Sequence, residues 1–172
     1  IPMQLVADFN VLEQDTSGAW NLLFTSTVNY DTTSGGLMPS VVSIYGVEVY
    51  TFIDTITMPG DGYYAISWDN CCRNGAIINM SNPLSESMKL STFLTVDSLN
   101  PNSSASYTTP PVAYLPAHTL WQYNPLPFDL DGDSLAWYLD VPLDDNGTVT
   151  GYEFLSDSAY SDSAAVFALD SV

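Results

Sequence analysis

The sequence predicts an all-β protein made of tandem immunoglobulin-like or cadherin-like antiparallel β-sandwich domains. Two observations support this prediction: apolar residues alternate with a period of two in several runs, and turn-forming residues separate those runs at regular intervals. The sequence contains no convincing helical stripe. Short strands punctuated in this way are typical of antiparallel sandwiches rather than of βαβ sheets.

The first clear alternation predicts a strand whose one face carries Leu22, Phe24, Ser26, Val28 and Tyr30. The run 41–58 is rich in β-branched and aromatic residues, so it predicts one bent strand or two, with Gly46 as a bend or bulge. The run GYYAISW at 62–68 predicts a further strand.

Three later runs complete the expected strands. MKLSTFLTV alternates between an apolar face and a polar one, and the apolar face carries Met88, Leu90, Thr92, Leu94 and Val96. A second run places Leu135, Trp137, Leu139 and Val141 on one face, and AAVFAL at 164–169 is a weaker candidate. Tryptophans at inward positions of sandwiches are usually core residues, so we assign Trp68 and Trp137 to the core.

Turn signals lie between these runs. They are TSGG at 33–36, PGDG at 59–62, SNP at 81–83 and DDNG at 144–147. The last is the best hairpin signal, because asparagine and glycine accept positive φ.

The segment 99–120 interrupts this rhythm with proline, serine and threonine, as a linker or an extended edge segment does. We therefore expect one β-sandwich domain at 1–105 and a second at 106–172. An immunoglobulin-like sandwich needs about seven strands in roughly 100 residues, so we expect the second domain to lack its last strands.

The charge of the chain is extreme. Twenty acidic residues stand against Arg73 and Lys89, which gives a formal net charge of −18. Such a surface repels nucleic acid and anionic lipid, and it favours cations as partners. No apolar run is long enough to cross a bilayer, and the start at Ile1 suggests a mature product from which a targeting segment has been removed.

The segment FDLDGDSLAWYL crowds three carboxylates, Asp129, Asp131 and Asp133, into five residues. Calcium takes six to eight oxygen ligands, so these side chains would form half a calcium site that backbone carbonyls complete. Ser134 stands where an EF-hand loop requires glycine, and a strand is expected to follow, which excludes that motif. The alternative is an ordinary aspartate-rich turn with hydrated carboxylates.

Three stretches carry a resemblance to a known family. DLDGDSL resembles the DPDGDSL signature of cadherin-like and immunoglobulin-type repeats of bacterial surface proteins. The segments 67–83 and 107–135 are similar to large secreted surface proteins of Bacteroidota that are associated with gliding motility and adhesion. The resemblance implies a secreted, multidomain, non-enzymatic scaffold exported by the type IX route.

Family members commonly carry additional cysteines, whereas this chain has only the adjacent pair Cys71 and Cys72. The pair cannot staple a long loop, and its spacing matches no zinc framework. A strained vicinal disulfide and two buried thiols are both compatible with the sequence, and either is a structural rather than a catalytic feature.

The same resemblance implies O-glycosylation at Asp-Ser or Asp-Thr followed by a small apolar residue. Ser158 and Ser163 are the leading candidates, followed by Thr55 and Ser98, and the tripeptide also occurs at Asp133 and Asp170. Plain composition is the competing explanation, because short tripeptides recur by chance.

The sequence gives little support for a catalytic function. His118 is the single histidine, and no G-x-S-x-G elbow accompanies it. A glycosidase needs only two carboxylates, but nothing in the sequence gathers acids and aromatics into a cleft.

We therefore expect no enzyme, but an extracellular structural or adhesive module that calcium rigidifies. Its expected partners are neighbouring domains or subunits of one surface structure, a homopolymer included, together with glycans or other cell surfaces. An adhesin repeat and a filament protomer remain open alternatives. A carbohydrate-binding or carbohydrate-active module is the second hypothesis, and exposed aromatics beside a cleft would favour it.

Overall fold

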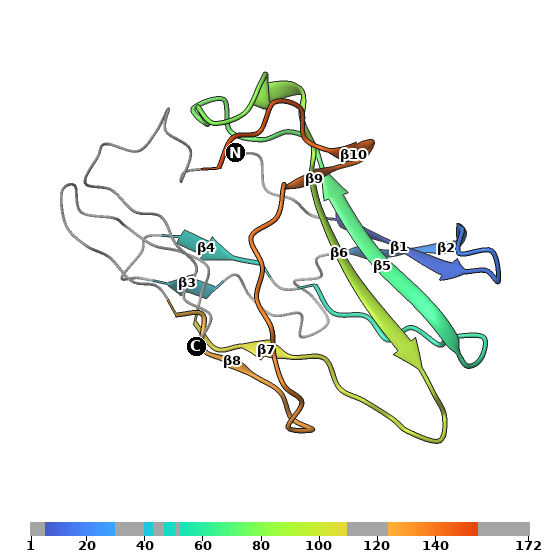
Figure 1. Cartoon of the computed structure of the whole chain (residues 1–172). Helices are drawn as coiled ribbons and strands as arrows, with labels where there is room; N and C mark the ends of the chain where they lie inside the picture. The colour runs from blue at the N-terminus through green and yellow to red at the C-terminus, as the bar shows by residue number, and fades with distance from the viewer. Residues whose placement is uncertain (1–5, 30–39, 43–46, 51, 110–123, 155–172) are drawn as a thin grey trace.

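The computed structural model describes residues 6–29, 40–42, 47–50, 52–109 and 124–154. Over these residues the protein is all-β, as predicted, and a single 3-10 turn, η1 (Pro83–Ser85), is the helical element among them (Figure 1). No helix in these ranges has the length and apolarity needed to span a membrane.

Six strands form the main sheet, in the order β10-β9-β6-β5-β1-β2, with every neighbouring pair antiparallel. Their bounds are β1 Val6–Gln14, β2 Trp20–Asn29, β5 Gly62–Asn70, β6 Met88–Val96, β9 Leu143–Asp144 and β10 Gly147–Thr148. Two small antiparallel pairs accompany this sheet, namely β3 (Ser40–Val42) with β4 (Val47–Val49) and β7 (Ser106–Tyr107) with β8 (Pro127–Phe128). The main sheet thus takes strands from both sides of Ser106, and the division at that residue stays a prediction.

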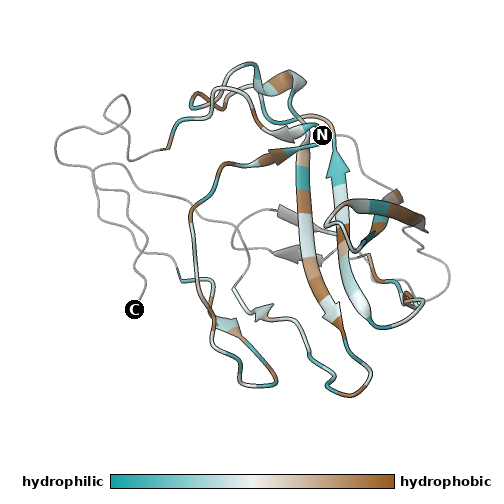
Figure 2. Ribbon diagram, turned by 45° about the vertical axis from the view of Figure 1, so that its right-hand side comes forward, coloured by the Kyte–Doolittle hydropathy of each residue, from teal (hydrophilic) through white to brown (hydrophobic). Residues whose placement is uncertain are grey.

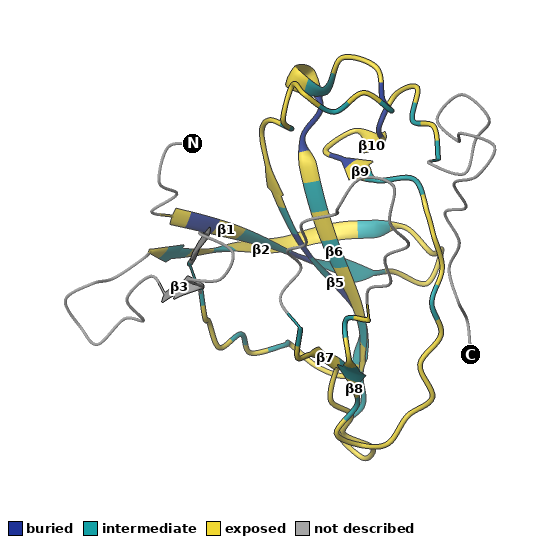
Figure 3. Ribbon diagram, turned by 90° about the vertical axis from the view of Figure 1, so that its left-hand side faces the viewer, coloured by how far each residue is buried: buried dark blue, intermediate teal, exposed yellow. Residues whose placement is uncertain are grey.

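The strand register assigns the central side chains to two faces of the sheet. Val11 lies opposite Ile66, which lies opposite Thr92, so these residues share what we name the Val11 face. Val11 and Tyr64 are fully buried, and the Tyr64 hydroxyl donates to the Gly60 carbonyl at 2.9 Å. The core therefore lies where β1 and β5 pair with each other, in the middle of the sheet (Figure 3).

The β1–β2 ladder contains a register shift that the alternation did not predict. Val11 pairs with Phe24 whereas Leu12 pairs with Leu22, so Leu23 is an extra residue in β2. Because a bulge reverses the alternation beyond it, Leu22 does not share the face of Phe24. The expected single face is wrong at Leu22, and Tyr30 lies outside the described residues.

The predicted strand over Leu135–Val141 is wrong. These residues have no strand assignment, and the chain from β8 to β9 runs as an irregular extended segment along the molecule (Figure 1). Alternating apolar residues show that a segment could form a strand, but they do not determine whether another strand lies beside it. Among the described strands, none pairs with this run. Trp137 is half-buried against Tyr107, with ring centroids 5.7 Å apart, so it packs without belonging to a strand.

The hairpin predicted at DDNG is confirmed, although its strands are only two residues each. β9 and β10 pair through Leu143 with Thr148 and Asp144 with Gly147, and Gly147 takes a φ of 137°. The run 41–58 holds two short strands, β3 and β4, while Gly46 and the AAVFAL run lie outside the described residues.

Candidate functional site

The aspartate loop at 129–133 folds around the carboxylate of Asp129. Its Oδ1 accepts the backbone N–H of Asp131 at 2.9 Å and that of Asp133 at 3.1 Å. Gly132 has a φ of 82°, a left-handed conformation that glycine adopts without steric strain. Asp131 and Asp133 are exposed and Asp129 is half-buried, so the loop presents two of its carboxylates openly to solvent.

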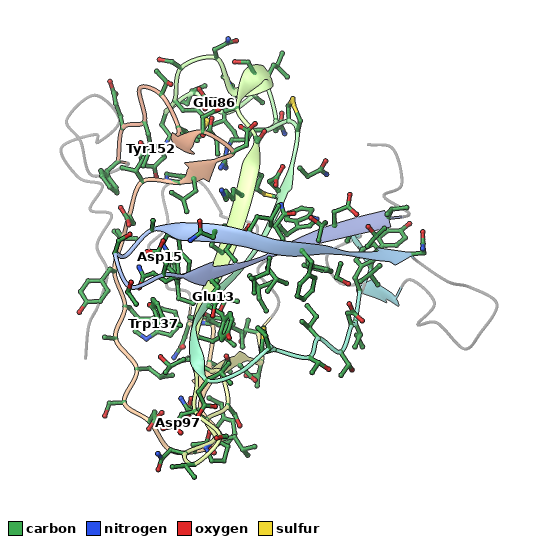
Figure 4. All side chains as sticks on the ribbon, turned by 90° about the vertical axis from the view of Figure 1, so that its right-hand side faces the viewer. Glu13, Asp15, Glu86, Asp97, Trp137 and Tyr152 are labelled. Carbon is green, nitrogen blue, oxygen red and sulfur yellow. A yellow bond between two sulfur atoms is a disulfide. The ribbon has the colours of Figure 1, made fainter. Side chains whose placement is uncertain are left out.

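A second contact ties this loop to the chain that leaves β6. Oδ2 of Asp131 accepts the backbone N–H of Ser103 at 2.5 Å, across 28 residues of sequence. The segment that leads to Ser103 is itself held by Asp97, whose carboxylate accepts the N–H of Leu99 and the side-chain amide of Asn100. The loop is thus attached to the connection between β6 and β7, at the end of the sheet where Figure 4 labels Asp97.

The donor chemistry of this loop suits calcium, because its carboxylates are hard oxygen ligands. In this conformation one oxygen of Asp129 and one of Asp131 already accept backbone N–H groups. Within the described ranges, no group of three or more His, Cys, Asp or Glu side chains is placed to hold a metal ion. Calcium binding stays a prediction, and it requires the second oxygens and the Asp133 carboxylate to converge by side-chain rotation.

Hydrogen bonds lower the pKa of several carboxyls, among them those of the exposed Asp15 and the half-buried Asp97. The Ser17 hydroxyl, then the Asn21 amide and the backbone N–H groups of Ala19 and Ser17, lower the pKa of Asp15 to about 2. The Asn100 amide and the Leu99 N–H lower the pKa of Asp97. These shifts show that the chain uses carboxylates as acceptors that organise its turns.

Arg73 forms the second polar junction. Its Nε donates to the Ser87 carbonyl at 3.0 Å and its Nη2 to the Leu143 carbonyl at 2.7 Å, while its backbone N–H donates to the Glu86 carbonyl. The one pair that joins β6 to β9 is Lys89 with Leu143, so the guanidinium reinforces a minimal ladder. The sequence pattern around Arg73 does not predict this structural role. The feature that could have drawn attention to Arg73 is that it is one of only two basic residues in the chain.

Glu86 lies buried beside this junction, at the end of the sheet that also carries Tyr152 (Figure 4). Its Oε1 accepts the Thr150 N–H at 3.4 Å, whereas Oε2 is buried without a hydrogen-bond partner among the described residues. A buried oxygen without a partner has lost its hydrogen bonds to water, and no hydrogen bond within the protein replaces them. Glu86 therefore lowers the free energy of unfolding relative to a fully paired group.

Cys71 and Cys72 are joined in a disulfide, and both residues are exposed. They follow β5 directly and precede Arg73. The alternative of two buried thiols therefore does not describe this structure.

The candidate O-glycosylation residues divide between described and undescribed parts of the chain. Thr55 and Ser98 are exposed, and the Ser98 hydroxyl donates to Oδ2 of Asp61 at 3.0 Å. Ser158 and Ser163 lie outside the described residues, as does His118. Modification of all four serines and threonines stays a prediction.

Aromatic side chains gather on both faces of the sheet. On the Val11 face, an apolar hollow of about 390 Å³ is lined by Phe9, Trp68, Ala7 and two residues of the 50–56 segment, Tyr50 and Phe52. On the opposite face Trp20, Tyr63 and Phe93 contact one another, with centroids 5.4 to 6.5 Å apart. Trp68 is half-buried in the wall of the hollow rather than enclosed in a core.

Comparison with known proteins gives no relative. No family model matches the chain, and neither curated proteins nor solved structures show significant similarity to it.

Proposed function

We propose that this chain is a non-enzymatic structural or adhesive module of a secreted bacterial surface protein or filament, rigidified by calcium at the 129–133 loop. Its place is extracellular, it leaves the cell by the type IX route, and it carries O-linked glycans. Its partners are neighbouring domains or subunits of the same structure. The module belongs to a tandem array of immunoglobulin-like or cadherin-like sandwich domains.

The observation that carries this proposal is the bond between Asp131 and the Ser103 N–H. It attaches the aspartate loop to the connection that follows β6, so a cation bound by the loop would act on two segments far apart in sequence. A cation there would offset the repulsion among three carboxylates and restrict motion between those segments. The sequence motif and the acidic surface support the same interpretation.

Calorimetry in excess chelator and in millimolar calcium tests the proposal. Stabilisation should follow RT ln(1 + [L]/Kd), or about 2.7 kcal/mol at a hundredfold excess over Kd. Asp131→Asn removes one ligand charge yet keeps an oxygen that accepts the Ser103 N–H. The control is Asp145→Asn, an equal charge change in the turn between β9 and β10.

Calcium should raise the melting temperature of the wild type and of Asp145→Asn, and much less that of Asp131→Asn. Equal shifts in all three proteins would mean general screening of the −18 charge, and the loop would be only a turn.

A second candidate function is carbohydrate binding, which the aromatic lining of the hollow favours. Its volume of about 390 Å³ falls within the usual range of small-ligand sites. Aromatic faces such as that of Trp68 suit the apolar faces of neutral sugar rings, and an acidic surface disfavours anionic ones.

A further inference from the structure

β2 forms one edge of the main sheet. It is ten residues long, and among the described strands only β1 pairs with it. Figure 3 shows most of this strand in the colour of exposed residues. The opposite edge strand, β10, is two residues long, and β6 pairs with β9 at Lys89 only, so Leu90–Val96 of β6 is a second open run. β2 is the longer of the two open runs among the described strands.

The sequence of β2, WNLLFTSTVN, contains no charged residue and no proline. Natural proteins protect long edge strands with charges, prolines or bulges, because the unpaired backbone groups otherwise template a new strand. The bulge at Leu23 disturbs one end only, and Phe24–Asn29 stays in regular register with Val6–Val11. The strand itself thus adds no like charge to a pairing between copies of a chain whose net charge is −18.

We propose that Phe24–Asn29 pairs antiparallel with the same segment of a second copy of this chain. The pairing joins two six-stranded sheets into one, about a twofold axis perpendicular to the sheet. The recognition is β-strand addition, in which backbone hydrogen bonds supply the affinity. It goes beyond the proposed function, because it requires neither calcium nor a surface array.

Side-chain matching selects the register of this pairing. Directly opposed residues must point to the same face, which restricts the axis to positions that pass through a residue. With the axis at Ser26, Phe24 opposes Val28 and Thr25 opposes Thr27 of the second copy. Aromatic with β-branched and threonine with threonine are favourable cross-strand pairs. Moving the axis by one residue in either direction leaves Phe24 opposite Ser26, or opposite a position beyond Asn29.

Two carboxylates lie close to this edge and oppose the pairing. The Ser26 hydroxyl donates to Oδ2 of Asp54, and the Thr27 hydroxyl donates to Oδ1 of Asp8 at 2.6 Å. With the axis at Ser26, the Asp54 carboxylates of the two copies approach each other. Association should therefore strengthen with ionic strength and on Asp54→Asn, which keeps an acceptor for Ser26 while removing the charge.

Sedimentation velocity of the whole chain, from micromolar to millimolar protein, tests the proposal. The salt levels are about 0.1 M and about 1 M sodium chloride, where the Debye length is about 10 Å and about 3 Å. The blocking variant is Thr25→Glu, which sets a charge opposite Thr27 and Asp8 of the second copy. The control is Thr95→Glu, the same change at an exposed threonine in the open run of β6, so it reports whether that edge associates instead. Thr25→Glu also removes the Thr25 hydroxyl, which donates to Oδ1 of Asn10 at 2.7 Å.

The expected result is a monomer–dimer equilibrium that tightens at high salt. Thr25→Glu should weaken it about tenfold or more, and Thr95→Glu about twofold or less. A monomer under every condition, equal weakening by both variants, or assemblies larger than a dimer would overturn the proposal. Asp54→Asn that fails to tighten the dimer would overturn the Ser26-centred register. Circular dichroism of each variant checks that the change acts on association and not on folding.

Discussion

Removing the Arg73 side-chain donors should detach the β9–β10 hairpin from the sheet. Arg73→Met keeps the apolar stem and removes the two bonds, to the Ser87 and Leu143 carbonyls. Hydrogen bonds from charged groups contribute about 1.5–3 kcal/mol each, and the half-exposed position of Arg73 favours the low end of that range. We expect a loss of about 2–3 kcal/mol in the free energy of unfolding. Arg73→Lys should recover about half of it, because one ammonium cannot reach both carbonyls as the guanidinium fork does.

Lys89→Met is the matched control, because it removes the chain's other positive side chain, and that side chain makes no hydrogen bond within the described part of the chain. Urea unfolding measures the free energies, and amide exchange localises the effect. Exchange of the Val149 N–H, which donates to the Pro142 carbonyl at 3.0 Å, should accelerate in Arg73→Met while β1 and β2 stay protected. Equal losses in Arg73→Met and Lys89→Met would refute the reasoning, since general charge balance would then explain both.

Two further predictions concern single side chains. The pKa of Asp15 is depressed to about 2, so its contribution to the free energy of unfolding is present above about pH 3.8 and is lost as the pH falls through about 2. Asp15→Asn should therefore flatten the dependence of the free energy of unfolding on pH in that range. An NMR titration that gives the Asp15 carboxyl a pKa near 3.8 would contradict this prediction. For carbohydrate binding, a neutral oligosaccharide should change the tryptophan fluorescence of the wild type and of Trp20→Phe but not of Trp68→Phe; an unchanged wild type would exclude the hollow as a sugar site.

The strands that were predictable are those in which local pattern and turn chemistry agree. β5 follows PGDG and β6 follows a proline turn, and apolar residues recur at alternate positions through most of each strand. β1 was not predicted from the sequence. Ala7, Phe9 and Val11 do alternate with polar residues, but three alternate positions are too few to identify a strand by periodicity. Its central place in the sheet depends on pairing with β2 and β5, which sequence periodicity does not encode.

The candidate site was predictable in its residues but not in its contacts. Three aspartates around a glycine identify a tight turn with surplus oxygen ligands, and the structure has that turn. That Asp131 reaches Ser103 depends on two segments brought together by the whole fold. The role of Arg73 was equally unpredictable from the sequence, because the two carbonyls to which it donates lie 14 and 70 residues away.

The excess of acid in this chain has a local use that explains how it folds with two basic residues. In the turn that follows β1, Asp15 accepts the N–H groups of Ser17 and Ala19, and Asp129 does the same for two residues of its own loop. Backbone N–H groups thus stabilise the carboxylates that ion pairs would otherwise stabilise. These bonds act over a few ångströms, however, and leave the long-range repulsion of a −18 surface unchanged. Any salt therefore stabilises the chain by screening, and only a response specific to calcium and to Asp131 distinguishes a bound ion from that screening.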